Sequence, residues 1–152
     1  VTLSRNGEMF VELLFNDFIR FIGDDFTLGG INEATEIPVK CCVKQEIFGD
    51  YAIRTYISME KEVAIAFASR YVKDTFSDYD EYVQASLEDF LNLQNGLFIV
   101  NVSNDSSMEL TIGAPEHVPG DTFTFKNQTY HFPFMFPFGT VNIYIEAVKI
   151  NV

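Results

Sequence analysis

The sequence predicts one α/β domain, of the α+β kind, in which helices pack on a largely antiparallel sheet. Three observations lead to this prediction. Apolar residues recur at helical spacing in three segments. Strand-like segments follow one another across short turns, as in antiparallel sheets, rather than alternating with helices. The order of a helix followed by strands occurs twice, which predicts two pseudo-repeated halves, about 6–76 and 77–152, within a single domain of 1–152.

The first half begins with a predicted helix over residues 7–22, where apolar residues recur at helical spacing. The next segment, 24–35, is rich in Asp, Gly and Asn, and we expect a loop there. Residues 36–48 and 51–59 are predicted to form two strands. A Gly-Asp pair stands between these strands and is typical of a hairpin turn.

Two more helices are predicted at the centre of the chain. Residues 61–72 have an apolar side at helical spacing. Ser77, Asp78 or Asp80 can cap the following helix, because each offers a side-chain oxygen to the first free backbone N–H groups. We expect that helix to continue to roughly Asn95 or beyond.

The second half ends in predicted strands, at 107–113, 121–126, 128–133 and 139–150. The last of these alternates two sets of side chains by parity, as a strand with two different faces does. Prolines separate the first of these strands from the second. No interdomain linker is apparent, so we assign these strands to the same domain as the first half.

A run of phenylalanines and prolines occupies residues 131–138. Proline cannot donate to a strand ladder, so we expect an edge strand or a loop there rather than a central strand. The run is predicted to pack over the core. The alternative is an exposed apolar patch at a dimer contact or a partner surface.

The charge balance excludes some partner classes. The formal net charge is -12, from 22 acidic and 10 basic residues. Nucleic acids and anionic membranes attract clustered Lys and Arg, so neither is an expected partner. No apolar run reaches the length of a membrane span, and the first residues do not resemble a signal peptide. The chain lacks an initiator Met, which leaves open that it is a segment of a longer protein.

Cysteine and histidine usage points to an intracellular domain without a metal site. Cys41 and Cys42 are adjacent, and neighbouring strand side chains point to opposite faces, so a disulfide between them is not expected. A chain without a disulfide framework is typical of the cytoplasm. His117 and His131 are the only histidines, and neither belongs to a cluster with zinc-ligand spacing.

The third predicted helix carries the candidate site. At about 100° per residue, its core stripe faces away from a group formed by Ala85, Asp89, Asn92 and Gly96. Glu88 lies at the edge of this group. A helix-interior Gly costs roughly 1 kcal/mol relative to Ala, a cost that close approach of another backbone would justify. Spacing alone favours a different interpretation, in which Gly96 simply ends the helix.

This pattern resembles the CheC/CheX family of chemotaxis phosphatases. An active helix of that family carries Glu, two residues, Asn, and then Gly four residues after the Asn, with Pro twenty-three positions after the Asn. Here Asp89 lies three residues before Asn92, Gly96 four after it and Pro115 twenty-three after it. Many members have Asp or Ser four residues before the acid, where this chain has Ala85.

The first predicted helix resembles the same motif without a site. Glu12 precedes Asn16 as Glu88 precedes Asn92, and Pro38 follows as Pro115 does. In the first helix Leu13 replaces the acid, and Arg20 stands where the Gly would be. The resemblance therefore covers most of the chain.

The resemblance implies a phosphatase that hydrolyses the aspartyl phosphate of a CheY-type response-regulator receiver. The receiver is expected to supply Mg²⁺ and a Lys, so the chain needs no cofactor of its own. Asn92 would orient the attacking water, Asp89 would pair with the receiver's Lys, and Gly96 would let the helix lie close. Asp89 ranks above Glu88 because it holds the family spacing, although the family has Glu there.

The resemblance also implies a cytoplasmic homodimer. The alternative to a phosphatase is a domain of the same superfamily that binds without catalysis, as a receiver-binding module, a scaffold or a part like the flagellar switch proteins. Sensing of a small molecule in a Phe-rich pocket is a third class, without a specific residue to support it.

Overall fold

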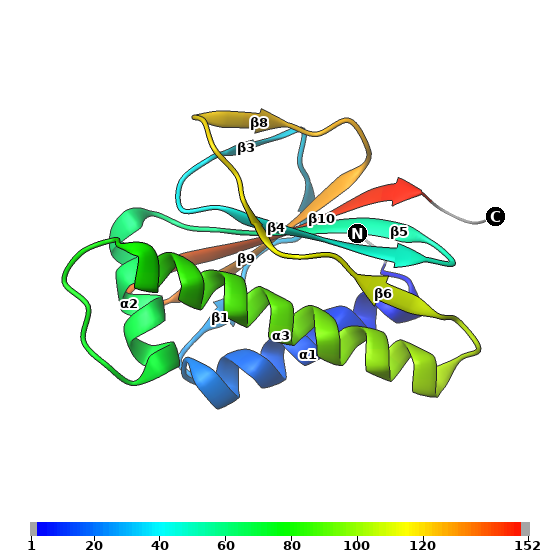
Figure 1. Cartoon of the computed structure of the whole chain (residues 1–152), viewed down its shortest axis with the longest axis horizontal. Coiled ribbons are helices and arrows are strands. Elements are labelled where there is room, and N and C mark those ends of the chain that lie inside the picture. The colour runs from blue at the N-terminus through cyan, green and yellow to red at the C-terminus, as the bar shows by residue number, and fades with distance from the viewer. Residues whose placement is uncertain (1–2, 150–152) are drawn as a thin grey trace.

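A computed structural model describes residues 3–149 of the chain. These residues form three helices and ten strands, mostly paired into one sheet (Figure 1). The helices are α1 (Arg5–Phe21), α2 (Lys61–Val72) and α3 (Glu81–Asp105). The strands are β1 (Thr27–Leu28), β2 (Asn32–Glu33), β3 (Glu36–Pro38), β4 (Val43–Gly49), β5 (Ala52–Ser58), β6 (Leu110–Ile112), β7 (Glu116–His117), β8 (Thr122–Thr124), β9 (Thr129–Phe136) and β10 (Gly139–Lys149).

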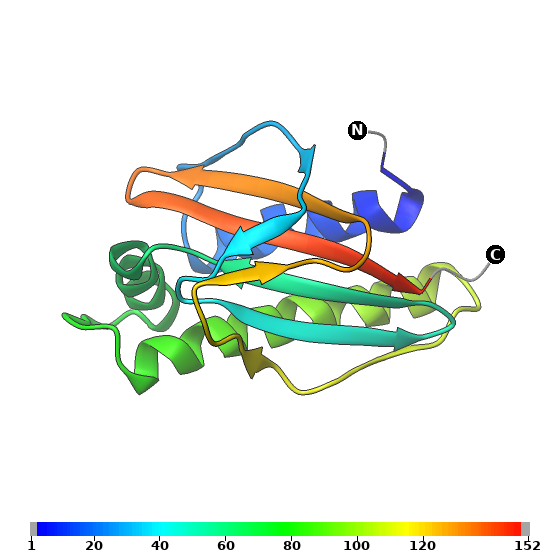
Figure 2. The ribbon, with the colours of Figure 1, turned by 90° about the horizontal axis from the view of Figure 1, so that it is seen from above.

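The main sheet is antiparallel and has the order β1-β9-β10-β5-β4-β6, with β2 paired to β9 and β7 paired to β4. The helices lie on one side of this sheet, and a small β3-β8 ribbon lies on the other (Figure 1). Seen from above, the ribbon crosses the long strands, beneath which α3 runs (Figure 2). The predicted fold class, helices on a largely antiparallel sheet, is confirmed.

The order of the strands is symmetric about the central pair, β10 and β5. From the central pair, β10 leads to β9 and then to β1 and β2, while β5 leads to β4 and then to β6 and β7. Each side therefore ends in two short strands on a longer one. The division into halves of about 6–76 and 77–152 stays a prediction, and the sheet pairs strands from both sides of that boundary.

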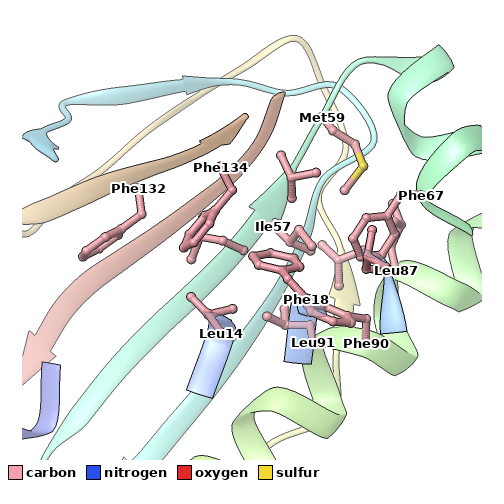
Figure 3. Close-up of a cluster of buried hydrophobic side chains, with 14 of the residues drawn as sticks. Leu14, Phe18, Ile57, Met59, Phe67, Leu87, Phe90, Leu91, Phe132 and Phe134 are labelled. Carbon is pink, nitrogen blue, oxygen red and sulfur yellow. The ribbon is translucent and has the colours of Figure 1, made fainter. Parts of the chain in front are cut away.

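The main core lies between the helices and the sheet, and phenylalanine rings pack there among aliphatic side chains (Figure 3). Phe18 of α1 stacks on Phe90 of α3, with ring centroids 5.2 Å apart, and meets Phe134 of β9 at 4.8 Å. These separations lie in the range of favourable aromatic pairs. Phe67 of α2 contacts Phe90 edge-on, so a single ring cluster joins all three helices to the sheet.

The phenylalanine run corrects one prediction. It forms β9 and the turn that follows, and β9 is paired on both sides rather than lying at an edge or in a loop. Phe132, Phe134 and Phe136 are buried, which confirms that the run packs over the core and not as an exposed patch. Pro133 falls opposite the gap between β1 and β2, where the outer neighbour is interrupted and an N–H donor is not needed.

Element boundaries differ from the predictions in several places. The predicted 61–72 helix is confirmed as α2, and the hairpin turn joins β4 to β5. The 24–35 segment was expected to be a loop but contains β1 and β2, and 36–48 divides into β3 and β4. The last strand reaches Lys149, and residue 150 lies outside the described residues. None of the described helices is long and apolar enough to cross a bilayer.

Candidate functional site

Helix α3 begins at a strong cap and continues past the predicted end. The Asp80 carboxylate accepts hydrogen bonds from the backbone N–H groups of Tyr82 and Val83, both at 3.0 Å. This satisfies two donors that the first helical turn leaves free. The interpretation of Gly96 as the helix end is wrong, because the helix runs for nine more residues and buries Phe98 and Val102.

The predicted site residues share one side of α3. Ala85, Asp89 and Asn92 are exposed, while Glu88 and Gly96 are half-buried. The opposite side is buried in the core, as predicted, through Val83, Leu87, Phe90, Leu91 and Phe98. The helix thus presents an acid and an amide one turn apart to solvent.

Asp89 is held toward α2 by a tyrosine that the motif does not contain. The Tyr71 hydroxyl donates a hydrogen bond of 2.5 Å to Asp89 Oδ2. Burial, then the bond to Asp89 and the nearby charge of Asp17, raise the pKa of Tyr71, so its hydroxyl stays a donor at neutral pH. Beside this pair, Tyr71, Val72, Phe76 and Tyr82 line part of an open hollow of about 610 Å³ between α2 and α3.

Asn92 is tied to the sheet by a buried side chain of β4. Gln45 Nε2 donates to Asn92 Oδ1 at 2.8 Å and to the Gly113 carbonyl oxygen at 2.7 Å. Gln45 is 1% exposed, whereas Asn92 stands at the surface. The two donors of one carboxamide therefore join the exposed amide of α3 to the backbone that follows β6.

Two further polar residues complete a network beneath α3. Asn95 Nδ2 donates to Gln45 Oε1 at 2.8 Å and to Thr55 Oγ1 at 2.9 Å. The Thr55 hydroxyl in turn donates to the Gln45 carbonyl oxygen at 3.1 Å. Asn95 and Thr55 are fully buried. Buried amides are costly unless paired, so this network is a built feature of the helix–sheet contact.

Sequence reasoning missed Gln45, Asn95 and Thr55. One signal was present, because Gln45 shares strand parity with Val43 and Ile47, both of which are buried. A polar residue on the core face of a strand indicates a buried partner. Which partner it meets is set by α3, 47 positions further along the chain.

Gly96 lies beside open space on α3, whereas Pro115 lies in the segment between β6 and β7. A Cβ added at Gly96 would meet no atom within 4 Å, so packing within the chain does not require glycine there. Pro115 lies between β6 and β7, two residues after Gly113. The Gly113 N–H donates to the Glu46 carbonyl oxygen at 3.0 Å, so the segment before Pro115 is fixed to β4. The contact of this segment with Asn92 runs through Gln45.

Glu88, the second acid, lies close enough to Tyr79, in the segment before α3, for its charge to act on that residue. Burial is the main cause that raises the pKa of Tyr79, and the charge of Glu88 adds to it. Of the two acids, Asp89 is the one that accepts a hydrogen bond from Tyr71.

The described residues contain no cluster of three or more His, Cys, Asp or Glu side chains that could hold a metal ion. Cys42 is buried, which raises the pKa of its thiol to about 12, and Cys41 is half-buried. His131 stacks on Tyr144, and its Nε2 lies 2.7 Å from Asn142 Oδ1. These side chains are used in packing.

No protein-family model and no curated protein matches the sequence. Solved structures do match. Over 95% of this chain and 99% of the other, the structure is similar to a chemotaxis protein CheX from Desulfovibrio desulfuricans, with a TM-score of 0.80 and 17% identity. A CheC-like superfamily protein from Shewanella sp. PV-4 gives 0.80 and 18%, over 95% and 98% of the two chains.

A third similar structure is a CheX–CheY–BeF3–Mg²⁺ complex from Borrelia burgdorferi. Its TM-score is 0.75 and its identity 16%, over 94% of this chain and 97% of the other. The chain therefore has the fold of the CheX- and CheC-type chemotaxis proteins. The resemblance predicted from the motif is confirmed at the level of the fold.

Proposed function

We propose that this chain binds a phosphorylated CheY-type receiver domain and hydrolyses its aspartyl phosphate, in chemotaxis or another two-component pathway. The observation that carries the proposal is the exposed pair of Asp89 and Asn92, one turn apart on α3, with the Asn92 carboxamide anchored from below by Gln45. The fold supports it, because a CheX protein of the same fold was captured with CheY.

The reaction needs little chemistry from the phosphatase itself. Water attacks the phosphorus in line, the bond from phosphorus to the aspartyl oxygen breaks, and inorganic phosphate and a free carboxylate result. The receiver's Mg²⁺ and Lys would neutralise the phosphoryl oxygens. Asn92 would position the water without adding charge to an already anionic site.

Asn92 retains the hydrogen-bonding capacity that this role requires. A carboxamide oxygen has two lone pairs, so Asn92 Oδ1 can accept from a water in addition to Gln45. The Nδ2 group carries two donors that can bind that water or a phosphoryl oxygen. An ordered amide at the surface therefore offers both an acceptor and donors to the reacting groups.

Asp89 would supply the charge that orients the two proteins. A carboxylate opposite the receiver's Lys fixes the register of the complex and speeds association. Asp is one methylene shorter than the Glu of the family motif, so the helix has to lie closer to the receiver. Gly96, on the same helix, would permit that closer approach. Pro115 and Ala85 would lie at the margin of this contact, and Glu88 would remain with Tyr79.

The cytoplasmic location, the homodimer and the absence of a resident cofactor belong to the same proposal. The Mg²⁺ ion would arrive with the receiver. Size-exclusion chromatography with light scattering tests the dimer, and EDTA addition during a hydrolysis assay tests the metal. Loss of activity with EDTA is expected even though the described part of this chain carries no metal cluster.

The decisive experiment measures phosphate release from a phosphorylated cognate receiver with wild type, Asn92→Ala and Asn104→Ala. Asn104 is exposed near the end of α3, so its variant controls for a change in the same helix. We expect Asn92→Ala to lose hydrolysis by at least about 100-fold, while it still binds the BeF3-activated receiver. Equal release by wild type and Asn92→Ala would refute the assignment, and binding without any hydrolysis would favour the non-catalytic alternative.

A further inference from the structure

A buried amide of β4 sets the orientation of the exposed amide of α3. We propose that Gln45 is a positioning residue, which binds one lone pair of Asn92 Oδ1 and so leaves the other lone pair and the Nδ2 donors in a fixed orientation for the reacting groups. This inference rests on the proposed function of Asn92. It adds a residue that the helix motif does not contain, from a strand 47 positions earlier in the chain.

The orientation follows from which groups can donate. The Gly113 carbonyl oxygen can only accept, so the side-chain atom of Gln45 that lies 2.7 Å from it has to be the amide nitrogen. The Gly113 N–H is bonded to the Glu46 carbonyl oxygen at 3.0 Å, which keeps this residue beside β4. The second donor of Gln45 Nε2 then requires an acceptor at Asn92, which is Oδ1.

The other end of the Gln45 carboxamide is fixed by the same reasoning. Its Oε1 accepts from Asn95 Nδ2, which also donates to Thr55 Oγ1. The Thr55 hydroxyl uses its single proton on the Gln45 carbonyl oxygen, so it can only accept from Asn95. The series of bonds from Gly113 to Thr55 therefore excludes an exchange of the oxygen and nitrogen positions in the side-chain amides of Gln45, Asn95 and Asn92. The bonds among Gln45, Asn95 and Thr55 are buried, so water does not compete for them.

The consequence for catalysis is an amide that is ordered before the receiver arrives. An exposed Asn without such an anchor rotates about its last side-chain bond and exchanges donor and acceptor freely. A hydrogen bond of ordinary strength biases that exchange by roughly 2- to 10-fold. Because the bias acts on the reacting group and not on the contact surface, it is expected in kcat rather than in KM for the receiver.

The test compares Gln45→Met with Gln94→Met in the full chain. Gln45→Met keeps the length and removes the donors to Asn92, whereas Gln94→Met removes another buried amide, which donates to the Phe10 carbonyl oxygen at 3.1 Å and is not hydrogen-bonded to the side chains of Gln45, Asn92 or Asn95. Loss of the bias lowers the correctly oriented fraction of the Asn92 amide by up to about 2-fold. We therefore expect Gln45→Met to lower kcat by up to about 2-fold at an unchanged KM, and Gln94→Met to leave kcat near wild type. Equal losses of kcat in the two variants would overturn the inference, because loosening of α3 would explain both.

A measurement without activity separates this inference from the proposed function. The side-chain ¹⁵N order parameter of Asn92, measured by NMR on the free protein, is expected to be high in wild type and to fall in Gln45→Met. If Gln45→Met does not fold, Gln45→Asn, which keeps an amide too short to reach Asn92, takes its place. An unchanged order parameter would overturn the role of Gln45 even if the phosphatase activity is real. A wild type that is inactive but shows the expected fall would instead refute the proposed function alone.

Discussion

Replacing Gly96 by Ala is expected to stabilise the protein and weaken its action on the receiver. Gly96 is the sixteenth of 25 residues in α3, so it lies in the helix interior. Gly costs about 1 kcal/mol relative to Ala at such a position, and the new methyl would meet no atom of this chain within 4 Å. The free energy of unfolding should therefore rise by about 0.5–1 kcal/mol, which corresponds to roughly 1–4 °C in Tm for a chain of this size.

The same methyl is expected to hinder docking. If the receiver backbone lies against Gly96, forcing a methyl into that contact costs about 1–3 kcal/mol. That cost corresponds to a roughly 5- to 150-fold weaker complex. Urea denaturation measures the first effect, and titration of the BeF3-activated receiver measures the second. Asn104→Ala is the matched control, because it raises helix propensity in α3 away from the site.

Gly96→Ala is thus expected to raise the free energy of unfolding and to lower the affinity for the receiver. A Gly96→Ala variant that is more stable and binds the receiver as wild type does would show that no partner approaches this part of α3. A variant that is less stable than wild type would contradict the open space above Gly96. The first result would remove Gly96 from the candidate site.

Two further predictions concern groups around the site. Tyr71→Phe removes the hydroxyl that holds Asp89, so receiver binding should weaken by about 2- to 10-fold with little change in kcat. Tyr82→Phe serves as the control. Unchanged receiver binding by Tyr71→Phe would contradict this role of Tyr71. Asp17 is 4% exposed, and burial raises the pKa of its carboxyl to about 6 from the ordinary 3.8. The folded protein then binds the extra proton, so the free energy of unfolding should fall as pH rises from about 4 to about 6, by roughly 2–3 kcal/mol. Asp17→Asn should lack that part of the slope in urea denaturation across this range, and parallel profiles for the two proteins would contradict the assignment.

The elements that sequence reasoning predicted well are those that local chemistry determines. Helix α2 was predicted residue for residue, because its apolar side is continuous. The β4–β5 hairpin was predicted from its Gly-Asp turn, and Gly49 has a φ of +142°, which residues with a side chain rarely adopt. The site face of α3 followed from helical spacing in the same way.

The errors arose where a tertiary contact overrode a local rule. Pro133 suggested an edge or loop, yet it lies in a strand paired on both sides, because the outer neighbour is interrupted opposite it. Gly96 suggested a helix end, yet Phe98 and Val102 continue the buried stripe beyond it. Gln45 shares the buried face of β4 with Val43 and Ile47, but its partners Asn92 and Asn95 are identified only once α3 is placed on the sheet.

The polar network beneath α3 also determines where that helix can sit on the sheet. A ring-rich core accepts many arrangements of similar energy, since one apolar side chain can replace another against the strands. A slide of α3 by one turn, about 5.4 Å, would preserve much apolar contact but separate Asn95 from Gln45 and Thr55. Each buried amide left unpaired would cost about 1–3 kcal/mol. These amides therefore exclude the slipped arrangement, so that Asn92 stands at one height above the sheet.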